Sequence, residues 1–192
     1  MITGLQQTVA YLHELIRAEA RELDAGERGV VLGGLSQGCA ASLVAGLLWD
    51  GERLRGLVGM CGWLPFMREM ERVVVDEEEG GEDVFERNEN GQEEKRVSEV
   101  GAVAMSVLRE MLDLEAEGRS SRPAVLSTPV FLGHGSVDEK VSIQLGKASA
   151  ETLMSLGVDV EWHTYEGLGH WFSDEMIADM AHFLDEKASM EK

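Results

Sequence analysis

Three residues in this sequence are of the types that carry out nucleophilic acyl chemistry: Ser36, Asp138 and His170. Ser36 stands in the segment GLSQG, with a glycine two positions before it and another two positions after it. A serine hydroxyl is a weak nucleophile until a base removes its proton. The base is usually a histidine, and a buried carboxylate holds that histidine in the required orientation. The residue types therefore predict a serine nucleophile, provided that the fold brings the three together.

The serine lies where a buried strand is expected to end and a helix to begin. Residues 30–35 form the short continuous apolar run VVLGGL, which is typical of a buried strand, and residues 37–49 place alanine, leucine and valine on one helical face. A sharp turn between the two would strain the backbone of Ser36 and lift its hydroxyl above the sheet. We expect the flanking glycines to let the strand and the helix approach closely. A glycine-rich loop with an incidental serine is the alternative interpretation of this segment.

Asp138 and His170 follow two further expected strands. Strands are predicted at residues 54–60, 129–135 and 158–165, and helices at residues 5–23, 97–112, 141–156 and 173–187. Strands that alternate with helices indicate an α/β fold, with a mostly parallel sheet covered by helices on both faces. Functional residues gather at the carboxyl ends of such strands. We therefore expect Ser36, Asp138 and His170 to meet at one edge of the sheet.

Four other histidines compete with His170 for the role of base: His13, His134, His163 and His182. The first and the last fall on expected helices, in solvated or capping positions, and the third lies inside a strand. His134 ends a strand, where we expect it to shape the turn before Asp138. An ordinary turn carboxylate is the alternative interpretation of Asp138, and Glu139 is a neighbour that could take its place.

Composition limits the class of protein. The 192 residues and 44% hydrophobic content are those of one globular domain over residues 1–192. The net charge of −19 makes nucleic acid and anionic membranes poor partners. No run of about 18 apolar residues occurs, so no stable membrane insertion is expected. The charged first helix is unlike a signal peptide, and Cys39 and Cys61 have no metal-type spacing, which together predict a cytoplasmic protein with reduced thiols.

Four segments together resemble the acyl-protein thioesterase and phospholipase/carboxylesterase family of α/β-hydrolases. They are GLSQGCAAS at the nucleophile turn, GMCGWLPF after the next strand, FLGHGSVDEKVS around the acid, and TYEGLGH leading to the histidine. The resemblance covers about residues 5–65 and 126–186. The chain order serine, aspartate, histidine is also that of the α/β-hydrolases.

The resemblance implies a role for each matched residue. Ser36 would be the nucleophile, His170 the general base and then the general acid, and Asp138 the group that orients His170. The backbone N–H of Gln37 would contribute to the oxyanion hole.

Trp63 and Leu64 would border an acyl pocket, with plain core packing as the alternative. The family cleaves esters and thioesters, including fatty-acyl groups on protein cysteines and lysophospholipids. The resemblance implies no metal ion and no organic cofactor.

The chain departs from the family at residues 67–125, which we interpret as an acidic, partly disordered insertion within the domain. Residues 76–94 alone hold ten acids and one arginine, so a solvated loop is expected there. The apolar helix that follows would either pack on the surface or cover the pocket as a lid.

The chain also departs from the family on its N-terminal side, where family members have further strands and a loop that supplies a second oxyanion N–H. No such loop occurs upstream of Ser36 in this sequence, so the expected fold is N-terminally truncated. Val30, Val31 and Leu32 would then form an exposed apolar sheet edge that favours self-association.

Three hypotheses follow for function. The first is a hydrolase of acyl esters or thioesters that works through a Ser-His-Asp triad. The second is a truncated, catalytically impaired hydrolase domain, which acts only with a partner or arises from an incomplete gene model. The third, an acidic interaction protein working through residues 76–94, rests on the charge run alone.

Overall fold

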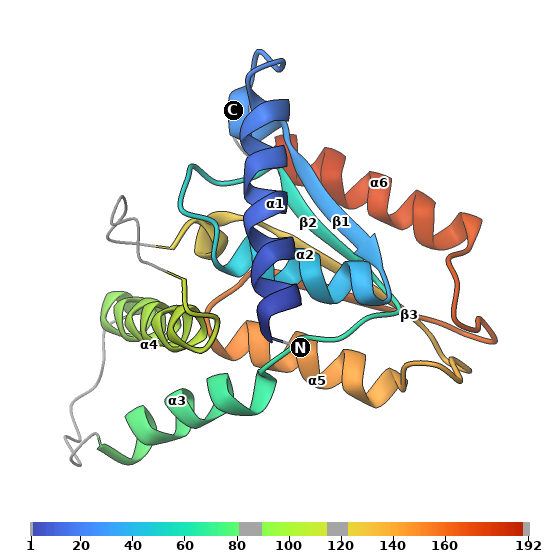
Figure 1. Cartoon of the computed structure of the whole chain (residues 1–192). Helices are drawn as coiled ribbons and strands as arrows, with labels where there is room; N and C mark the ends of the chain where they lie inside the picture. The colour runs from blue at the N-terminus through green and yellow to red at the C-terminus, as the bar shows by residue number, and fades with distance from the viewer. Residues whose placement is uncertain (1, 81–89, 115–122, 190–192) are drawn as a thin grey trace.

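One parallel sheet organises the chain, whose computed structural model describes residues 2–80, 90–114 and 123–189. The strands are β1 (Val31–Leu35), β2 (Gly56–Met60), β3 (Val130–Gly135) and β4 (Val160–Tyr165). They lie in the order β1-β2-β3-β4, and every neighbouring pair is parallel (Figure 1). All four carboxyl ends therefore meet at one edge of the sheet, as the sequence predicts.

Helices connect the strands. They are α1 (Ile2–Ala20), α2 (Gln37–Leu47), α3 (Met67–Gly80), α4 (Asn90–Met111), α5 (Ile143–Ser155) and α6 (Asp174–Ser189), with the short 3₁₀ turns η1 (Gly26–Gly29) and η2 (Ala124–Ser127). Among the described residues, no helix combines the length and the apolar character that crossing a membrane requires.

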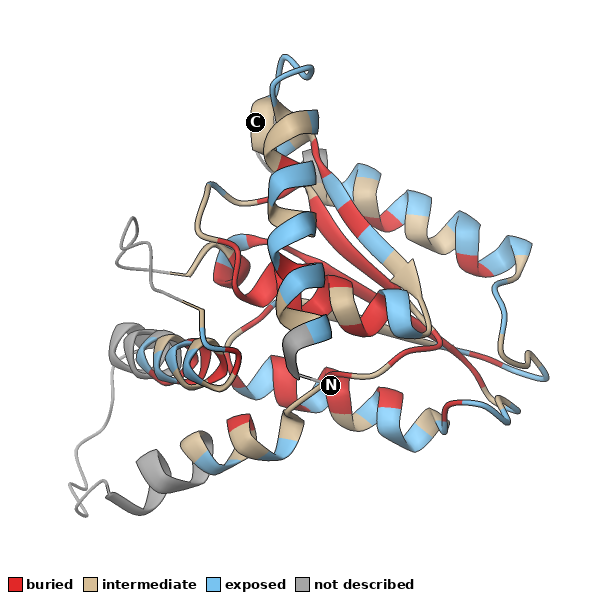
Figure 2. Cartoon of the chain, in the orientation of Figure 1, coloured by how far each residue is buried: buried red, intermediate tan, exposed pale blue. Residues whose placement is uncertain are grey.

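The sheet has one apolar core on each face, because successive side chains of a strand point to opposite sides. Leu57 and Leu132 belong to the larger core, which also holds buried residues of α1, α2, α4 and α5. Val58 and Phe131, their chain neighbours, belong to a smaller core against α6. Figure 2 shows the buried residues concentrated on the strands and on the inner sides of the helices. The predicted α/β architecture, with helices on both faces, is confirmed.

Within residues 67–125, the described parts are largely helical and pack into the larger core. The helices α3 and α4 extend into the stretch 76–94, which we expected to be a loop, up to Gly80 and from Asn90 onward; residues 81–89 lie outside the described residues. Met70 of α3 and Leu108 of α4 are fully buried in the larger core. The α4 helix thus contributes to the core instead of packing only on the surface or forming a lid.

The strand β1 lies at one end of the described sheet, where β2 is its neighbour. Of the three residues expected to form an exposed apolar edge, only Val31 is exposed, at 38%. Val30 and Leu32 are at most 9% exposed, because Leu32 points into the larger core and α1 and α2 cover that face. The expected exposed edge is therefore reduced to one apolar side chain.

Candidate active site

Ser36 occupies the turn between β1 and α2 with a backbone conformation that L-residues rarely adopt. Its φ is 58° and its ψ is −118°. The turn is held by two backbone hydrogen bonds, since Ser36 N–H donates to the Met60 carbonyl at 2.9 Å and the Ser36 carbonyl accepts from Ala40 N–H at 3.1 Å. A strained conformation of this kind persists only where its surroundings enforce it, and such residues cluster at functional sites.

The two glycines that flank Ser36 differ in what they do. A Cβ on Gly34 would lie 2.4 Å from the carbonyl carbon of Gly38 and 2.8 Å from the nitrogen of Cys39. A Cβ on Gly38 would meet no other atom within 4 Å. The expected close approach of strand and helix is therefore real, but it depends on Gly34, whereas the space around Gly38 does not require a glycine.

The first turn of α2 faces the serine. Gln37 opens this helix directly after Ser36, so its N–H is one of the four that an α-helix leaves without an internal partner. The positive end of the helix dipole lies at the same place. This is the environment in which a developing negative charge on a substrate oxygen would be stabilised.

Asp138 and His170 are joined directly. The Nδ1 of His170 lies 2.8 Å from Oδ2 of Asp138. The Asp138 side chain is fully buried, whereas that of His170 is 21% exposed. An ionised carboxylate only accepts hydrogen bonds, so Nδ1 of His170 carries the proton that it donates. In the neutral imidazole, Nε2 then has a free lone pair, which is the form that a general base requires.

His134 is a further partner of Asp138. Its Nε2 lies 3.2 Å from Oδ2 of Asp138 and 3.0 Å from the Val141 carbonyl, and its side chain is 1% exposed. The expectation that His134 shapes the turn is thus correct, but its direct approach to the carboxylate was missed. The four-residue spacing from His134 to Asp138, with a glycine between them, is the sequence signal that could have indicated it.

The carboxylate of Asp138 is held ionised by its surroundings. Burial by itself would raise its pKa, but hydrogen bonds outweigh that effect and lower the pKa below its usual value. The backbone N–H groups of Lys140 and Val141 donate to Oδ1 at 2.8 and 3.0 Å, and His170 donates to Oδ2. A permanently charged carboxylate is what orients and stabilises an imidazole that gains a proton.

The loop that carries His170 folds back over the carboxyl ends of β3 and β2, toward Ser36. A Cβ on Gly135, at the end of β3, would lie 2.1 Å from the Leu168 carbonyl oxygen. At the end of β2, Sγ of Cys61 lies 3.3 Å from the Trp171 carbonyl oxygen and 3.8 Å from the Gly169 carbonyl oxygen, so its one proton is shared between these two acceptors. Through these contacts the loop that follows β4 reaches the end of β2, the neighbour of β1.

No hydrogen bond joins the Ser36 hydroxyl to His170 within the described part of the chain. In structures without substrate, the hydrogen bonds of catalytic groups are often long and shorten when substrate binds. The structure thus brings Asp138 and His170 into contact, and it places Ser36 at the same edge of the sheet.

The two residues expected to border an acyl pocket have different surroundings. Leu64 is 2% exposed in the larger core, and its N–H donates to the Ser149 hydroxyl at 2.8 Å. Trp63 is half-buried and lines a small space of about 10 Å³, roughly the minimum that one water molecule needs. Their role in substrate binding stays a prediction.

Cys61, Asp138 and His170 form a cluster whose potential metal-binding atoms lie within 4.8 Å of one another. We assign no metal to this cluster. Oδ2 of Asp138 is already engaged by His170, and burial raises the pKa of the Cys61 thiol, whereas a metal ion needs the thiolate.

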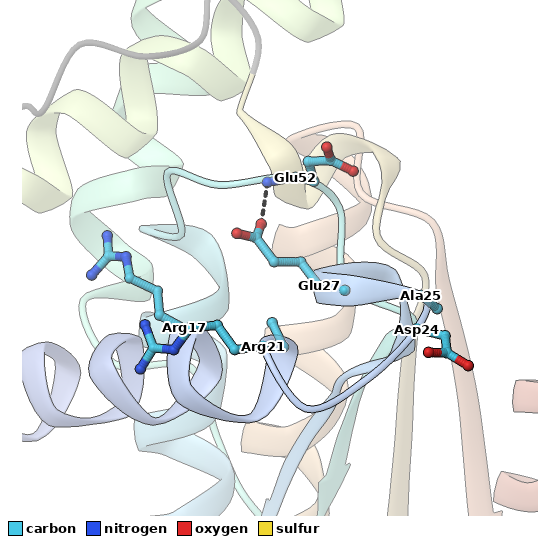
Figure 3. Close-up of a pocket in the computed structure, with 8 residues that line it drawn as sticks. Arg17, Arg21, Asp24, Ala25, Glu27 and Glu52 are labelled. Carbon is cyan, nitrogen blue, oxygen red and sulfur yellow. Dashed lines mark hydrogen bonds between the residues drawn. The ribbon is translucent and has the colours of Figure 1, made fainter.

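A second pocket, of about 510 Å³, lies at the opposite end of the sheet, beside the segments that lead into β1 and β2. Figure 3 shows the Glu27 carboxylate accepting a hydrogen bond from the N–H of Glu52, with Arg17 of α1 and Arg21, just after the end of α1, on the neighbouring wall. Arg17 is itself paired with Asp50 at 2.8 Å. This polar pocket is remote from the strand ends that carry Ser36 and His170.

A serine strained at the carboxyl end of a parallel strand, followed at once by a helix, has the geometry of the nucleophile turn found in the α/β-hydrolase fold. Solved structures share this fold. SOBER1 from Arabidopsis thaliana aligns with a TM-score of 0.65 and 21% identity, over 98% of this chain and 66% of that one. Acyl-protein thioesterase 2 from Zea mays aligns with a TM-score of 0.60 and 21% identity, over 97% and 65% of the two chains.

The chain belongs to the phospholipase/carboxylesterase family, which it matches over residues 2–78 and 95–188. The match is interrupted at residues 79–94, a much shorter stretch than the insertion expected over residues 67–125. Acyl-protein thioesterase 1 from Gibberella zeae is 30% identical over 184 residues, which are 94% of this chain and 57% of that protein. The chain thus spans less than two thirds of this relative's length.

Proposed function

We propose that this chain is a serine hydrolase that cleaves carboxylic esters or thioesters, with Ser36 as nucleophile, His170 as base and Asp138 as the residue that orients His170. The observation that carries the proposal is the hydrogen bond of 2.8 Å between His170 and Asp138, at the edge of the sheet where Ser36 is strained. Membership of the phospholipase/carboxylesterase family supports the same reaction class.

In the proposed first step, the Ser36 oxygen attacks the acyl carbon while Nε2 of His170 takes the hydroxyl proton. The buried, ionised Asp138 stabilises the imidazolium that forms. The backbone N–H of Gln37, at the start of α2, donates to the substrate oxygen as it becomes negative.

Collapse of the tetrahedral intermediate breaks the C–O or C–S bond. His170 then gives its proton to the departing oxygen or sulfur, and the acyl group stays on Ser36. In the second half of the reaction a water molecule attacks the acyl carbon, His170 takes the proton of that water, and Ser36 regains its own. Besides the substrate and this water molecule, the proposed steps use only Ser36, His170, Asp138 and the backbone N–H of Gln37.

The substrates we propose are acyl esters or thioesters, including acylated proteins and lysophospholipids, because relatives are named acyl-protein thioesterase and the family phospholipase/carboxylesterase. Trp63 would border the acyl group, with Leu64 behind it. We also propose a cytoplasmic location, supported by the free thiols of Cys39 and Cys61.

The proposal is tested by hydrolysis of a short nitrophenyl ester and of an acyl thioester by the purified 192-residue chain. We expect both to be cleaved, and Ser36→Ala to abolish both activities. Ser142→Ala is the matched control, because Ser142 is an exposed serine before α5. Equal turnover by Ser36→Ala and the parent chain would contradict the proposal.

One observation favours a second candidate, in which catalysis is impaired until a partner or a second copy pairs with β1. Within the described sheet β2 is the neighbour of β1, and Val31 is exposed there. An unpaired edge strand is a template for association with another chain. Light scattering alongside the ester assay distinguishes the two candidates: an active monomer would contradict the second, and activity confined to larger species would support it.

A further inference from the structure

The two residues after His170 form an exposed aromatic pair. The Trp171 and Phe172 side chains are 58% and 39% exposed. Their rings are stacked, with centroids 5.0 Å apart and an angle of 24° between the ring planes. Large aromatic side chains gain free energy when they are covered, so an exposed stacked pair is a surface suited to an apolar ligand.

The backbone that carries this pair is fixed at both ends. Trp171 N–H donates to the Gly169 carbonyl at 2.9 Å, and the Trp171 carbonyl accepts from the Cys61 thiol at 3.3 Å. Beyond Phe172, the Ser173 hydroxyl accepts from Met176 N–H at 3.1 Å and so caps α6. The aromatic pair therefore projects from an anchored turn.

The reaction itself determines which part of a substrate would meet these rings. In serine hydrolases the histidine delivers its proton to the leaving group, so the leaving atom must lie against that histidine. Trp171 and Phe172 follow His170 directly, in the loop that leaves β4 and contacts the end of β2 through the Trp171 carbonyl. The oxyanion donor, Gln37, comes from the β1 side, at the opposite end of the strand order.

We infer that Trp171 and Phe172 form a subsite for the leaving group, the alcohol or thiol part of the substrate, and that this subsite favours an apolar, uncharged leaving group over the phosphate-bearing leaving group of a lysophospholipid. The inference rests on the proposed function. Asp174 and Glu175 are exposed immediately after the aromatic pair, so an anionic leaving group would be repelled. The acyl chain would lie elsewhere, beside Trp63, as proposed above.

Two pairs of thioesters distinguish the leaving-group subsite from the acyl subsite, because each pair varies only one of the two groups. S-ethyl and S-hexyl thioacetate share the acetyl group and have leaving thiols of similar acidity, whereas S-ethyl thioacetate and S-ethyl thiohexanoate share the leaving group. Because kcat/KM reports the acylation step, Trp171→Ala and Phe172→Ala should lower kcat/KM for S-hexyl thioacetate roughly tenfold, through lost apolar contact. For both variants, kcat/KM for S-ethyl thioacetate should change by less than about twofold. The ratio of kcat/KM for S-ethyl thiohexanoate to that for S-ethyl thioacetate should change equally little.

Tyr11→Ala is the matched control, because Tyr11 is an aromatic residue on α1 that is 63% exposed. A loss that follows acyl length, or an equal loss for both leaving groups, would overturn the subsite assignment and leave the proposed function intact. Thioacetate turnover that persists in Ser36→Ala would instead contradict the proposed function.

A binding measurement tests the subsite independently of catalytic turnover. In ¹⁵N-labelled Ser36→Ala, added hexanol should shift the indole N–H signal of Trp171, which is identified by its loss in Trp171→Phe. The signals of the other tryptophans should move less. An unmoved Trp171 signal would overturn the inference.

Discussion

His170 and Asp138 are joined by a hydrogen bond of 2.8 Å between Nδ1 and Oδ2, although 32 positions separate them in the sequence. The contact exists because β3 and β4 are parallel neighbours, so the segments that follow them leave the sheet side by side. Two backbone N–H groups and His134 complete the surroundings of the carboxylate. The catalytic proposal depends on this relationship.

Asp138→Asn should lower kcat about 10⁴-fold, since an amide in this position selects the wrong imidazole tautomer. KM for a short ester should change little. Glu139→Gln is the control, because Glu139 is the exposed neighbour and should behave like the parent chain. If Glu139→Gln were the damaging change, the acid would be misassigned.

Stability should depend on pH through Asp138. Burial opposes ionisation, but the hydrogen bonds from Val141, His170 and Lys140 prevail, so the pKa in the folded chain lies below the value of about 3.9 of an unfolded aspartate. The ionised carboxylate therefore stabilises the fold above that value, and this contribution is lost as the pH falls through the folded pKa.

Urea unfolding at a series of pH values measures this effect. The free energy of unfolding of the parent chain should fall below a pH of about 5, and that of Asp138→Asn should fall less steeply over the same range. If the free energy of unfolding fell equally with pH in the two proteins, the pKa of Asp138 would not differ between the folded and the unfolded chain.

Gly34→Ala should destabilise the fold by about 1–3 kcal/mol, because the new methyl group would lie against the backbone of Gly38 and Cys39. Gly38→Ala should be tolerated or slightly stabilising, since the site has room and alanine favours the helix. Thermal unfolding of the two variants gives the comparison directly. Equal melting temperatures would show that β1 and α2 are farther apart than described.

Cys61→Ala should lower kcat roughly tenfold with little change in KM, because the thiol donates to the Trp171 carbonyl beside His170 and small displacements of a catalytic group are costly. Cys61→Ser keeps a donor and should restore most of the rate. Steady-state kinetics with a short ester compares the two. The anchoring role would be refuted by a serine variant no better than the alanine variant.

Much of this arrangement could be predicted from the sequence, because it depends on local patterns. The apolar runs that end at Leu35 and Gly135 predicted strands within a residue or two of their bounds, and the alternation of strands and helices predicted the parallel sheet. The strained turn at Ser36 and the contact between Asp138 and His170 followed from that topology.

Other features depend on contacts between distant segments, which periodicity does not encode. Leu108 lies on the helix expected at residues 97–112, but whether that helix packs on the surface or into the core is decided by the helices around it. The approach of His134 to Asp138 arises from the turn that follows β3. The resemblance to the family implied that Leu64 borders an acyl pocket, with core packing as the alternative, but it could not show that the Leu64 N–H donates to Ser149 of α5.

The most direct test of the central claim is covalent labelling by a fluorophosphonate probe, followed by peptide mass spectrometry. The probe reacts only with a serine whose proton is removed by a neighbouring base, so label should be found on Ser36 and on no other serine. His170→Ala should lose the label while keeping its fold, as judged by circular dichroism. Label on a different serine, or undiminished label in Ser36→Ala, would contradict the account.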